Sequence, residues 1–244
     1  RLMVSLIVLI ISYNLQAQVP GRETVSSDSK DRFILHIATI PSPGSDESKG
    51  FFEKVFNIIV GNEQVIYNNP INVYANGTRD VLILNQGDGS ILHYLDGKTS
   101  KLPVFRKNIS FFPSLVGICS FGNNGILFTD SGLEEVLLLS PDGKQFSIFI
   151  DSLKLKRPTG IAYSAIEDEI WVVETGEHHI SVFNSKGDRK RTVGKRGDGP
   201  LEFNYPTYIW IDGSGRIYIV DSMNFRIQIL SANGEFIKIG RAHV

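Results

Sequence analysis

One apolar run in each repeat of the chain ends in an acidic residue or, in the first repeat, in Asn85, and these residues are the first candidates for chemistry. The runs are 80–85, 125–130, 169–174 and 216–221. Carboxylates gathered in a small volume could hold a metal ion or act as acid and base. Each acid, however, precedes a turn and a further strand. We therefore expect these acids to cap that turn and pair with the next strand, as Asp221 would with Arg226. The acids are Asp130, Glu174 and Asp221.

Histidine and cysteine offer few alternatives for catalysis. His178 and His179 are adjacent, and neighbouring residues of a strand point to opposite faces, whereas a metal site needs three or four ligands in one volume. His179 occupies the repeat position of Arg226, so we expect the same pairing role. Cys119 is the only cysteine and lies in an apolar run, which predicts a small buried side chain and excludes an internal disulfide. No catalytic residue, metal ligand or cofactor site is predicted.

Charge argues against nucleic acid as a partner. Lys and Arg total 25 against 26 Asp and Glu, whereas a nucleic-acid surface needs a basic excess. Six basic residues nevertheless lie between 186 and 196. Such a run is typical of a solvated outer strand, or it could meet an acidic partner. We take Lys195 and Arg196, together with His178 and Tyr208, as candidate binding-surface residues.

The segment 194–200, with the sequence GKRGDGP, has three interpretations: a receptor-binding Arg-Gly-Asp, a phosphate cradle, or a polar connection between strands. No Lys-Ser/Thr pair and helix follow it, as a nucleotide-binding loop requires. We interpret it as a connection between two repeats, with Arg196 as a minor candidate contact.

The elements that must position these residues repeat with a period near 45. Pro70, Pro113, Pro158 and Pro206 are spaced 43, 45 and 48 residues apart, and each opens a unit of three apolar runs, a glycine turn such as the one at Gly234, and a fourth run. Four short strands in each unit indicate an all-β propeller of four-stranded antiparallel blades. A β-sandwich would not explain the proline-to-proline repeat.

Residues 205–230 resemble an NHL repeat, residues 156–183 resemble one more loosely, and residues 68–150 look like two degenerate copies. Members of that family usually close with six blades. The resemblance therefore implies four full blades, at about 68–110, 111–155, 156–204 and 205–240. Residues 33–60 would form a partial blade, so that 33–240 is part of a longer six-bladed parent.

The two ends of the sequence carry other signals. Residues 1–18 resemble a secretory signal peptide, residues 19–32 are polar and predict a disordered linker, and residues 241–244 look like a sequencing-adapter artefact. The apolar run is short for a membrane span, although a buried strand or an uncleaved anchor are alternatives. We expect an exported protein, periplasmic, extracellular or associated with the cell envelope, with no stable transmembrane span after cleavage.

The prediction for function is a non-catalytic scaffold that recognises a protein, glycan or cell-surface partner through its loops and channel mouth. One alternative is a hydrolase or lyase centred on the channel, because the family resembles lactonases that hold a channel metal among acids and Asn. The corresponding first-strand positions here are Asn72, Gly117, Gly160 and Tyr208. A calcium or zinc ion in the channel of the longer parent stays an open alternative. A second alternative is an accessory subunit of a membrane-associated assembly. The oligomeric state is not indicated.

Overall fold

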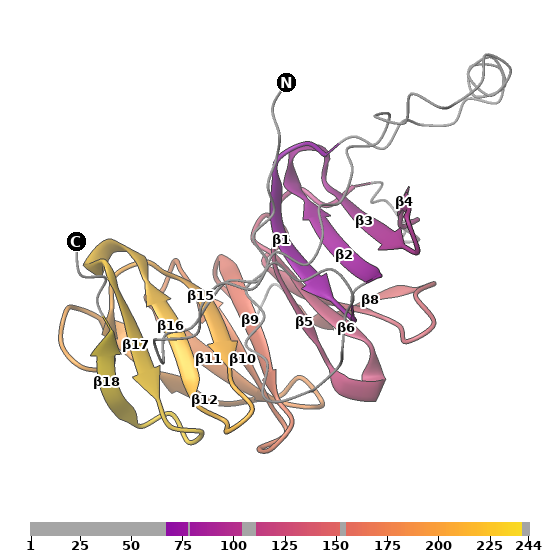
Figure 1. Ribbon diagram of the computed structural model, residues 1–244. Coiled ribbons are helices and arrows are strands. Elements are labelled where there is room, and N and C mark those ends of the chain that lie inside the picture. The colour runs from indigo at the N-terminus through magenta and orange to yellow at the C-terminus, as the bar shows by residue number, and fades with distance from the viewer. Residues whose placement is uncertain (1–66, 78, 104–110, 152–154, 241–244) are drawn as a thin grey trace, which may run out of the picture.

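The computed structural model describes residues 67–77, 79–103, 111–151 and 155–240, which form four four-stranded antiparallel sheets (Figure 1). Sheet 1 comprises β1 (Pro70–Ala75), β2 (Asp80–Asn85), β3 (Ser90–Leu95) and β4 (Lys98–Lys101). Sheet 2 comprises β5 (Leu115–Ser120), β6 (Ile126–Asp130), β7 (Glu135–Leu139) and β8 (Phe146–Ile150). Sheet 3 comprises β9 (Pro158–Ser164), β10 (Glu169–Glu174), β11 (His179–Asn184) and β12 (Arg189–Val193). Sheet 4 comprises β15 (Pro206–Ile211), β16 (Ile217–Asp221), β17 (Arg226–Leu230) and β18 (Phe236–Gly240).

Shorter elements connect these strands. Single 3₁₀ turns occur at η1 (Gln86–Asp88), η2 (Gly122–Asn124) and η3 (Ser222–Asn224). Between sheets 3 and 4, β13 (Lys195–Arg196) pairs in parallel with β14 (Glu202–Phe203). Each four-stranded sheet lies within one of the four blade ranges expected from the sequence. The expected signal peptide, linker, partial blade at 33–60 and adapter-like residues 241–244 lie outside the described residues.

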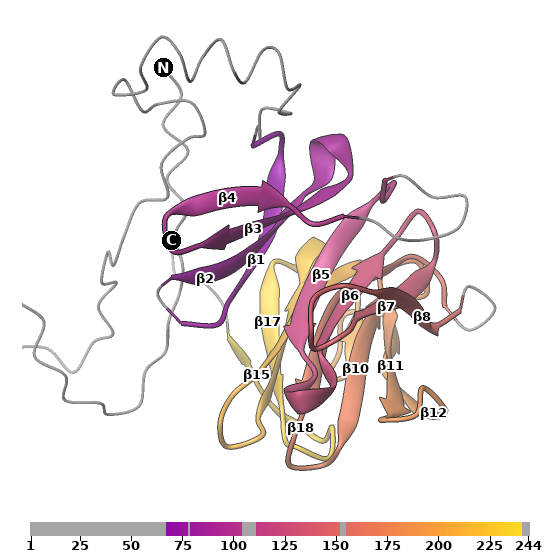
Figure 2. The same cartoon turned by 90° about the vertical axis from the view of Figure 1, so that its right-hand side faces the viewer.

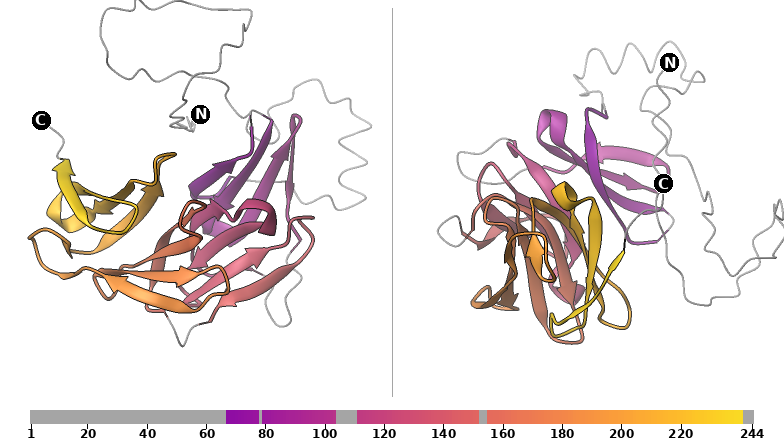
Figure 3. Two further views of the ribbon diagram at one scale, coloured as in Figure 1. Left: turned by 90° about the horizontal axis from the view of Figure 1, so that it is seen from below. Right: turned by 90° about the vertical axis from the view of Figure 1, so that its left-hand side faces the viewer.

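The sheets follow one another around an arc, with the first strand of each sheet on the inside (Figures 2 and 3). Strand β9 contacts both β5 and β15, and β1 contacts β5. The arrangement confirms the all-β propeller architecture. No helix in the described part of the chain is long and apolar enough to cross a membrane.

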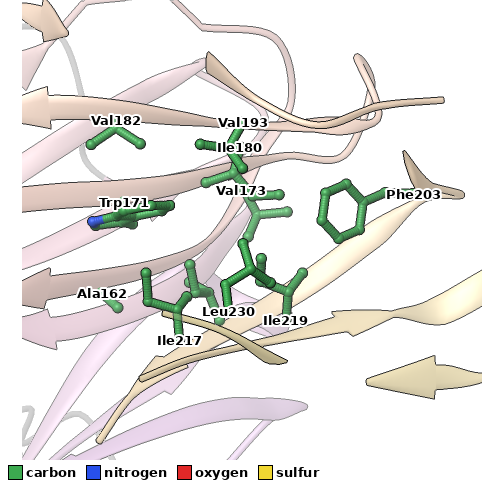
Figure 4. Packing of buried hydrophobic residues seen from close by; sticks show 11 residues of the cluster. Ala162, Trp171, Val173, Ile180, Val182, Val193, Phe203, Ile217, Ile219 and Leu230 are labelled. Atoms are coloured by element: carbon green, nitrogen blue, oxygen red, sulfur yellow. The ribbon is translucent and has the colours of Figure 1, made fainter. Parts of the chain in front are cut away.

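The hydrophobic core consists of layers between consecutive sheets. Every residue of β10 is buried, because one neighbouring sheet covers each of its faces. The fourth strand of sheet 3 is polar and largely exposed, as is expected at the outside of a blade. Between sheets 3 and 4, Trp171 and Val173 pack against Ile217, Ile219 and Leu230 (Figure 4).

One boundary differs from the sequence prediction. Pro70, Pro158 and Pro206 each begin the first strand of a sheet, whereas in sheet 2 that strand begins at Leu115, two residues after Pro113. Leu115 pairs with Asp130 as Pro206 pairs with Asp221. The start of the strand is therefore fixed by pairing with the end of the second strand, and proline marks it only approximately.

Candidate functional site

A buried ion pair links β16 and β17 at the end of sheet 4. Arg226 Nε donates to Asp221 Oδ2 at 2.7 Å, and the two side chains are 3% and 0% exposed. Asp221 Oδ1 also accepts from the backbone N–H of Asn204, at 2.7 Å. The two strands place Asp221 directly opposite Arg226, so the five-residue spacing in the sequence becomes a cross-strand contact.

The same guanidinium holds the loop that joins sheets 3 and 4. Arg226 Nη1 donates to the carbonyl of Asp198, and Nη2 donates to those of Gly199 and Glu202, at 2.9 and 2.8 Å. The carboxylate of Glu202 turns back and accepts from the N–H groups of Asp198 and Gly199, at 3.2 and 3.0 Å. These backbone N–H groups and the Lys195 ammonium lower the pKa of Glu202. Residues 194–203, here called the display loop, are therefore fixed through their backbone.

The side chains of the display loop differ in how far they are exposed and paired. Arg196 and Asp198 are exposed, and Arg196 makes no ion pair within the described residues. Lys195 pairs with Glu202 at 3.2 Å while remaining 76% exposed. Asn224 Nδ2 donates to the carbonyl of Gly197 at 2.9 Å, which ties the loop to η3. The loop therefore presents the Arg196 guanidinium and the Asp198 carboxylate, with the Lys195 ammonium paired to Glu202 beside them.

Glu174 is the equivalent acid of sheet 3. It is buried and accepts from the backbone N–H of Lys156 at 2.7 Å, from the Ser181 hydroxyl, and from Arg189 at 3.0 Å. His179 Nε2 lies 3.3 Å from Glu174 Oε1, so His179 occupies the place of Arg226. In sheet 2, Asp130 caps the following turn by accepting from the N–H groups of Gly132 and Leu133. Burial raises the pKa of Asp130 despite these bonds.

Three of the six basic residues, Arg189, Lys190 and Arg191, are neutralised within sheet 3. Lys190 and Arg191 both pair with Glu169, each at 2.6 Å, and the Arg191 guanidinium lies 5.1 Å from the centre of the Trp171 ring. Burial by itself raises the pKa of Glu169, but the bonds and charges of Arg191 and Lys190 outweigh it, and the pKa is lowered. Arg196 is therefore the more available cation of the two binding-surface candidates, Lys195 and Arg196.

The other two binding-surface candidates are His178 and Tyr208. His178 is buried, and its Nδ1 accepts from the backbone N–H of Tyr205 at 3.1 Å, with the two rings 4.4 Å apart. This places His178 inside the junction of sheets 3 and 4, in contrast to the surface position expected from the sequence. Tyr208 is 38% exposed on β15. Partial burial raises the pKa of Tyr208.

A further set of contacts joins consecutive sheets and was not identified from the sequence. In sheets 1 to 3 the second strand ends in Asn85, Asp130 or Glu174. The side chain of the residue that follows donates to the carbonyl of the first strand residue of the next sheet. Gln86 donates to Leu115 at 3.1 Å, and Thr175 donates to Pro206 at 2.6 Å. The remaining donor is Ser131, which binds the carbonyl of Pro158. The signal was present, because a hydroxyl or amide follows every terminal acid or Asn, at 86, 131, 175 and 222.

Three of the first-strand residues expected near the channel, Asn72, Gly117 and Gly160, also contact the next sheet. Asn72 Nδ2 donates to the carbonyl of Val116 at 3.0 Å. Gly117 and Gly160 have no room for a side chain, because an added Cβ would lie 2.3 Å from the Thr159 carbonyl oxygen and 2.8 Å from the backbone of Ile209. Within the described residues, no group of three His, Cys, Asp or Glu side chains is placed to hold a metal ion.

Comparison with known sequences agrees with this repeat architecture. The family described as "6-bladed beta-propeller" matches residues 150–241. NHL repeat-containing protein 3 of Mus musculus is 26% identical over 151 residues, covering 53% of this chain and 44% of the relative. The Homo sapiens protein of that name is 28% identical over 148 residues, covering 54% and 40%. These matches support the resemblance to NHL-repeat β-propellers. The chain spans less than half the length of these two relatives.

Solved structures show the same fold as this propeller. A streptogramin B lyase aligns with a TM-score of 0.54 at 15% identity, covering 72% of this chain and 55% of the lyase. An inactive virginiamycin B lyase of Staphylococcus aureus, solved with quinupristin, aligns with a TM-score of 0.56 at 17% identity, covering 72% and 56%. At these identities the likeness concerns the fold alone.

We expect the stability of this propeller to depend on pH through Glu174. Burial by itself raises the pKa of Glu174, but the bonds from His179, Ser181 and the Lys156 N–H and the charge of Arg189 lower it below the ordinary value of 4.5. The ionised carboxylate therefore stabilises the fold above about pH 4.5, and this contribution is lost as the pH falls through the folded-state pKa.

The variant Glu174→Gln tests this dependence by urea unfolding between pH 7 and pH 3. At pH 7 it should be less stable by about 1 to 3 kcal/mol, because buried donors lose their charged acceptor. The difference from the parent protein should shrink as the pH falls. A constant difference across this range would contradict the assignment.

Proposed function

We propose that this propeller is a non-catalytic scaffold and that the display loop, residues 194–203, is its contact surface for a protein or glycan partner. The observation that carries the proposal is the buried Arg226 guanidinium, which binds three carbonyls of the loop from behind. A backbone fixed in this way loses little conformational entropy when a ligand binds. Arg196 and Asp198 are then presented in a constant geometry.

The positions of the other polar candidates support a binding role for this protein in preference to a catalytic role. Asp221, Glu174 and His178 are buried and bonded to their own or the neighbouring sheet. Groups engaged in this way hold the scaffold together. Exposed side chains on loops that are anchored to a rigid fold are, in contrast, the usual position of binding residues.

The location in the cell is a second part of the proposal. The signal-like residues 1–18 support export, and therefore a partner in the periplasm, in the extracellular space or at the cell envelope. Immunoblotting of cell fractions with an antibody against the propeller tests this part. Detection only in the cytoplasm would contradict export and would leave the display-loop proposal standing.

Site-specific photo-crosslinking tests the contact surface. A photoreactive phenylalanine at position 196 in the full polypeptide, expressed in its source cells, should give a discrete crosslinked product that mass spectrometry identifies. The control position is Ser147, which is exposed on β8 of sheet 2. A product at both positions, or at Ser147 alone, would contradict the display loop as the contact surface.

The variant Arg196→Ala should then weaken binding of the identified partner by about 10-fold or more, because a charged contact contributes about 1.5 kcal/mol or more. Its free energy of unfolding should change by less than about 0.5 kcal/mol, because Arg196 is exposed and makes no ion pair in the described part of the chain. Calorimetric titration and urea unfolding measure the two quantities. Equal affinity of the variant and the parent would exclude Arg196 from the contact.

A further inference from the structure

The described part of the chain contains Asn-Gly pairs whose surroundings differ sharply. The pairs are Asn76-Gly77, Asn124-Gly125 and Asn233-Gly234. In such a pair the backbone nitrogen of glycine can attack the side-chain amide of asparagine, because glycine has no Cβ to hinder the approach. The reaction needs a backbone that can rearrange and a nitrogen that is not held by another group. The three glycines differ in both respects.

Gly77 is the least constrained of these glycines. It lies with Asn76 in the turn between β1 and β2, and both residues are exposed. A Cβ added at Gly77 would meet nothing within 4 Å, and the φ of +100° is a conformation that glycine adopts readily. In the described part of the chain the Gly77 N–H makes no hydrogen bond. Its nitrogen can therefore move toward the Asn76 amide without displacing a neighbour.

The other two glycines are held in place. Gly234 is buried, its N–H donates to the carbonyl of Ser231 at 2.9 Å, and an added Cβ would lie 2.9 Å from the Trp171 ring. Gly125 is also buried, and an added Cβ would lie 2.1 Å from the carbonyl oxygen of Leu139. Ring closure at either pair would require the surrounding sheet to open first.

We propose that Asn76 is a site of spontaneous deamidation in the folded protein, and that Asn124 and Asn233 are protected. The Gly77 nitrogen bonds to Cγ of Asn76, the Cγ–Nδ2 bond breaks, and Nδ2 leaves as ammonia with the proton that Gly77 gives up. A water molecule then adds across either C–N bond of the cyclic imide and yields aspartate or isoaspartate. Neither step oxidises or reduces the protein. This proposal is independent of the display loop.

Deamidation would reverse the role of the side chain at position 76. Asn76 Nδ2 donates to Asp80 Oδ2 at 3.2 Å, and the Asn76 backbone N–H donates to the Asp80 carbonyl at 2.8 Å. A carboxylate at this position can only accept, so two like charges would face each other at the end of the β1–β2 hairpin. The matching turn of sheet 4 carries opposite charges instead, with Asp212 paired to Arg216. The product therefore holds the end of its hairpin less well.

Peptide mapping by mass spectrometry tests the proposal on the full polypeptide, kept at pH 8 with and without urea. In the folded protein, conversion at Asn76 should be at least about 10-fold faster than at Asn124 or Asn233, because the buried pairs react only after local opening. In urea the three rates should agree within about 3-fold, since each Asn then precedes an unrestrained glycine. Conversion at Asn76 as slow as at the other two would overturn the proposal. A preference for Asn76 that persists unchanged in urea would trace to the local sequence and overturn it equally.

Two variants separate the reaction from its consequence. Gly77→Ala should slow conversion at Asn76 by about 10-fold or more, because the added methyl group hinders the attacking nitrogen. Asn76→Asp reproduces the charge of the product, and the backbone N–H of residue 76 should then exchange with deuterium at least about 5-fold faster than in the parent protein. Undiminished conversion in Gly77→Ala would contradict attack by the Gly77 nitrogen. Unchanged exchange in Asn76→Asp would contradict the weakened hairpin.

Discussion

Replacing Arg226 by alanine is expected to lower the free energy of unfolding by about 3 to 5 kcal/mol, because the variant leaves the Asp221 carboxylate buried without its partner. Arg226 also donates to three carbonyls of the display loop, at Asp198, Gly199 and Glu202, and each of these would lose one donor. Urea unfolding monitored by tryptophan fluorescence measures the change. Arg226→Lys should restore little of the loss, since an ammonium does not reproduce the planar fork of a guanidinium.

A matched control lies in the turn between β15 and β16. Arg216 pairs with Asp212 at 2.8 Å, but its side chain is 54% exposed. Arg216→Ala should therefore cost no more than about 1 kcal/mol, as exposed ion pairs do. Similar costs for Arg216→Ala and Arg226→Ala would contradict the view that burial and the loop carbonyls make Arg226 special. Hydrogen exchange adds a local readout, because the N–H groups of residues 198 and 199 should exchange faster in Arg226→Ala than in Arg216→Ala.

The parts of this junction that could be predicted from sequence are those set by local geometry. Two strands joined by a short turn place residues of fixed spacing opposite each other, so the pairing of Asp221 with Arg226 follows from the spacing alone. His179 could then be placed beside Glu174 by aligning the repeats. The glycine turns were predictable because a tight hairpin turn requires a positive φ. Gly234 has a φ of 87°.

Contacts that depend on the strand register, or on how one sheet sits on the next, could not be placed in this way. Glu169 meets Lys190 and Arg191 across the sheet, from more than 20 residues away, so the basic run looked free in the sequence. His178 was expected on the binding surface, but the sequence does not show its contact with the following sheet. Its left-handed backbone instead turns the imidazole toward Tyr205 of the following sheet.

Replacing Trp171 by alanine is expected to cost about 3 to 5 kcal/mol, because it would leave a large cavity between sheets 3 and 4. The indole is fully buried, and Val173, Ile217 and Leu230 belong to the same packed layer (Figure 4). The variant would also remove the ring beneath the Arg191 guanidinium, a contact of about 0.5 to 1 kcal/mol. Urea unfolding at neutral pH measures the total.

Trp171→Phe separates packing from hydrogen bonding. Within the described protein the indole Nε1–H has no hydrogen-bond partner, so phenylalanine removes volume but no bond. Its cost should be about 1 to 2 kcal/mol, well below that of alanine. A cost for Trp171→Phe equal to that of Trp171→Ala would mean that the Nε1–H contributes through a buried water molecule. The junction of sheets 3 and 4 would then depend on a polar contact as well as on apolar packing.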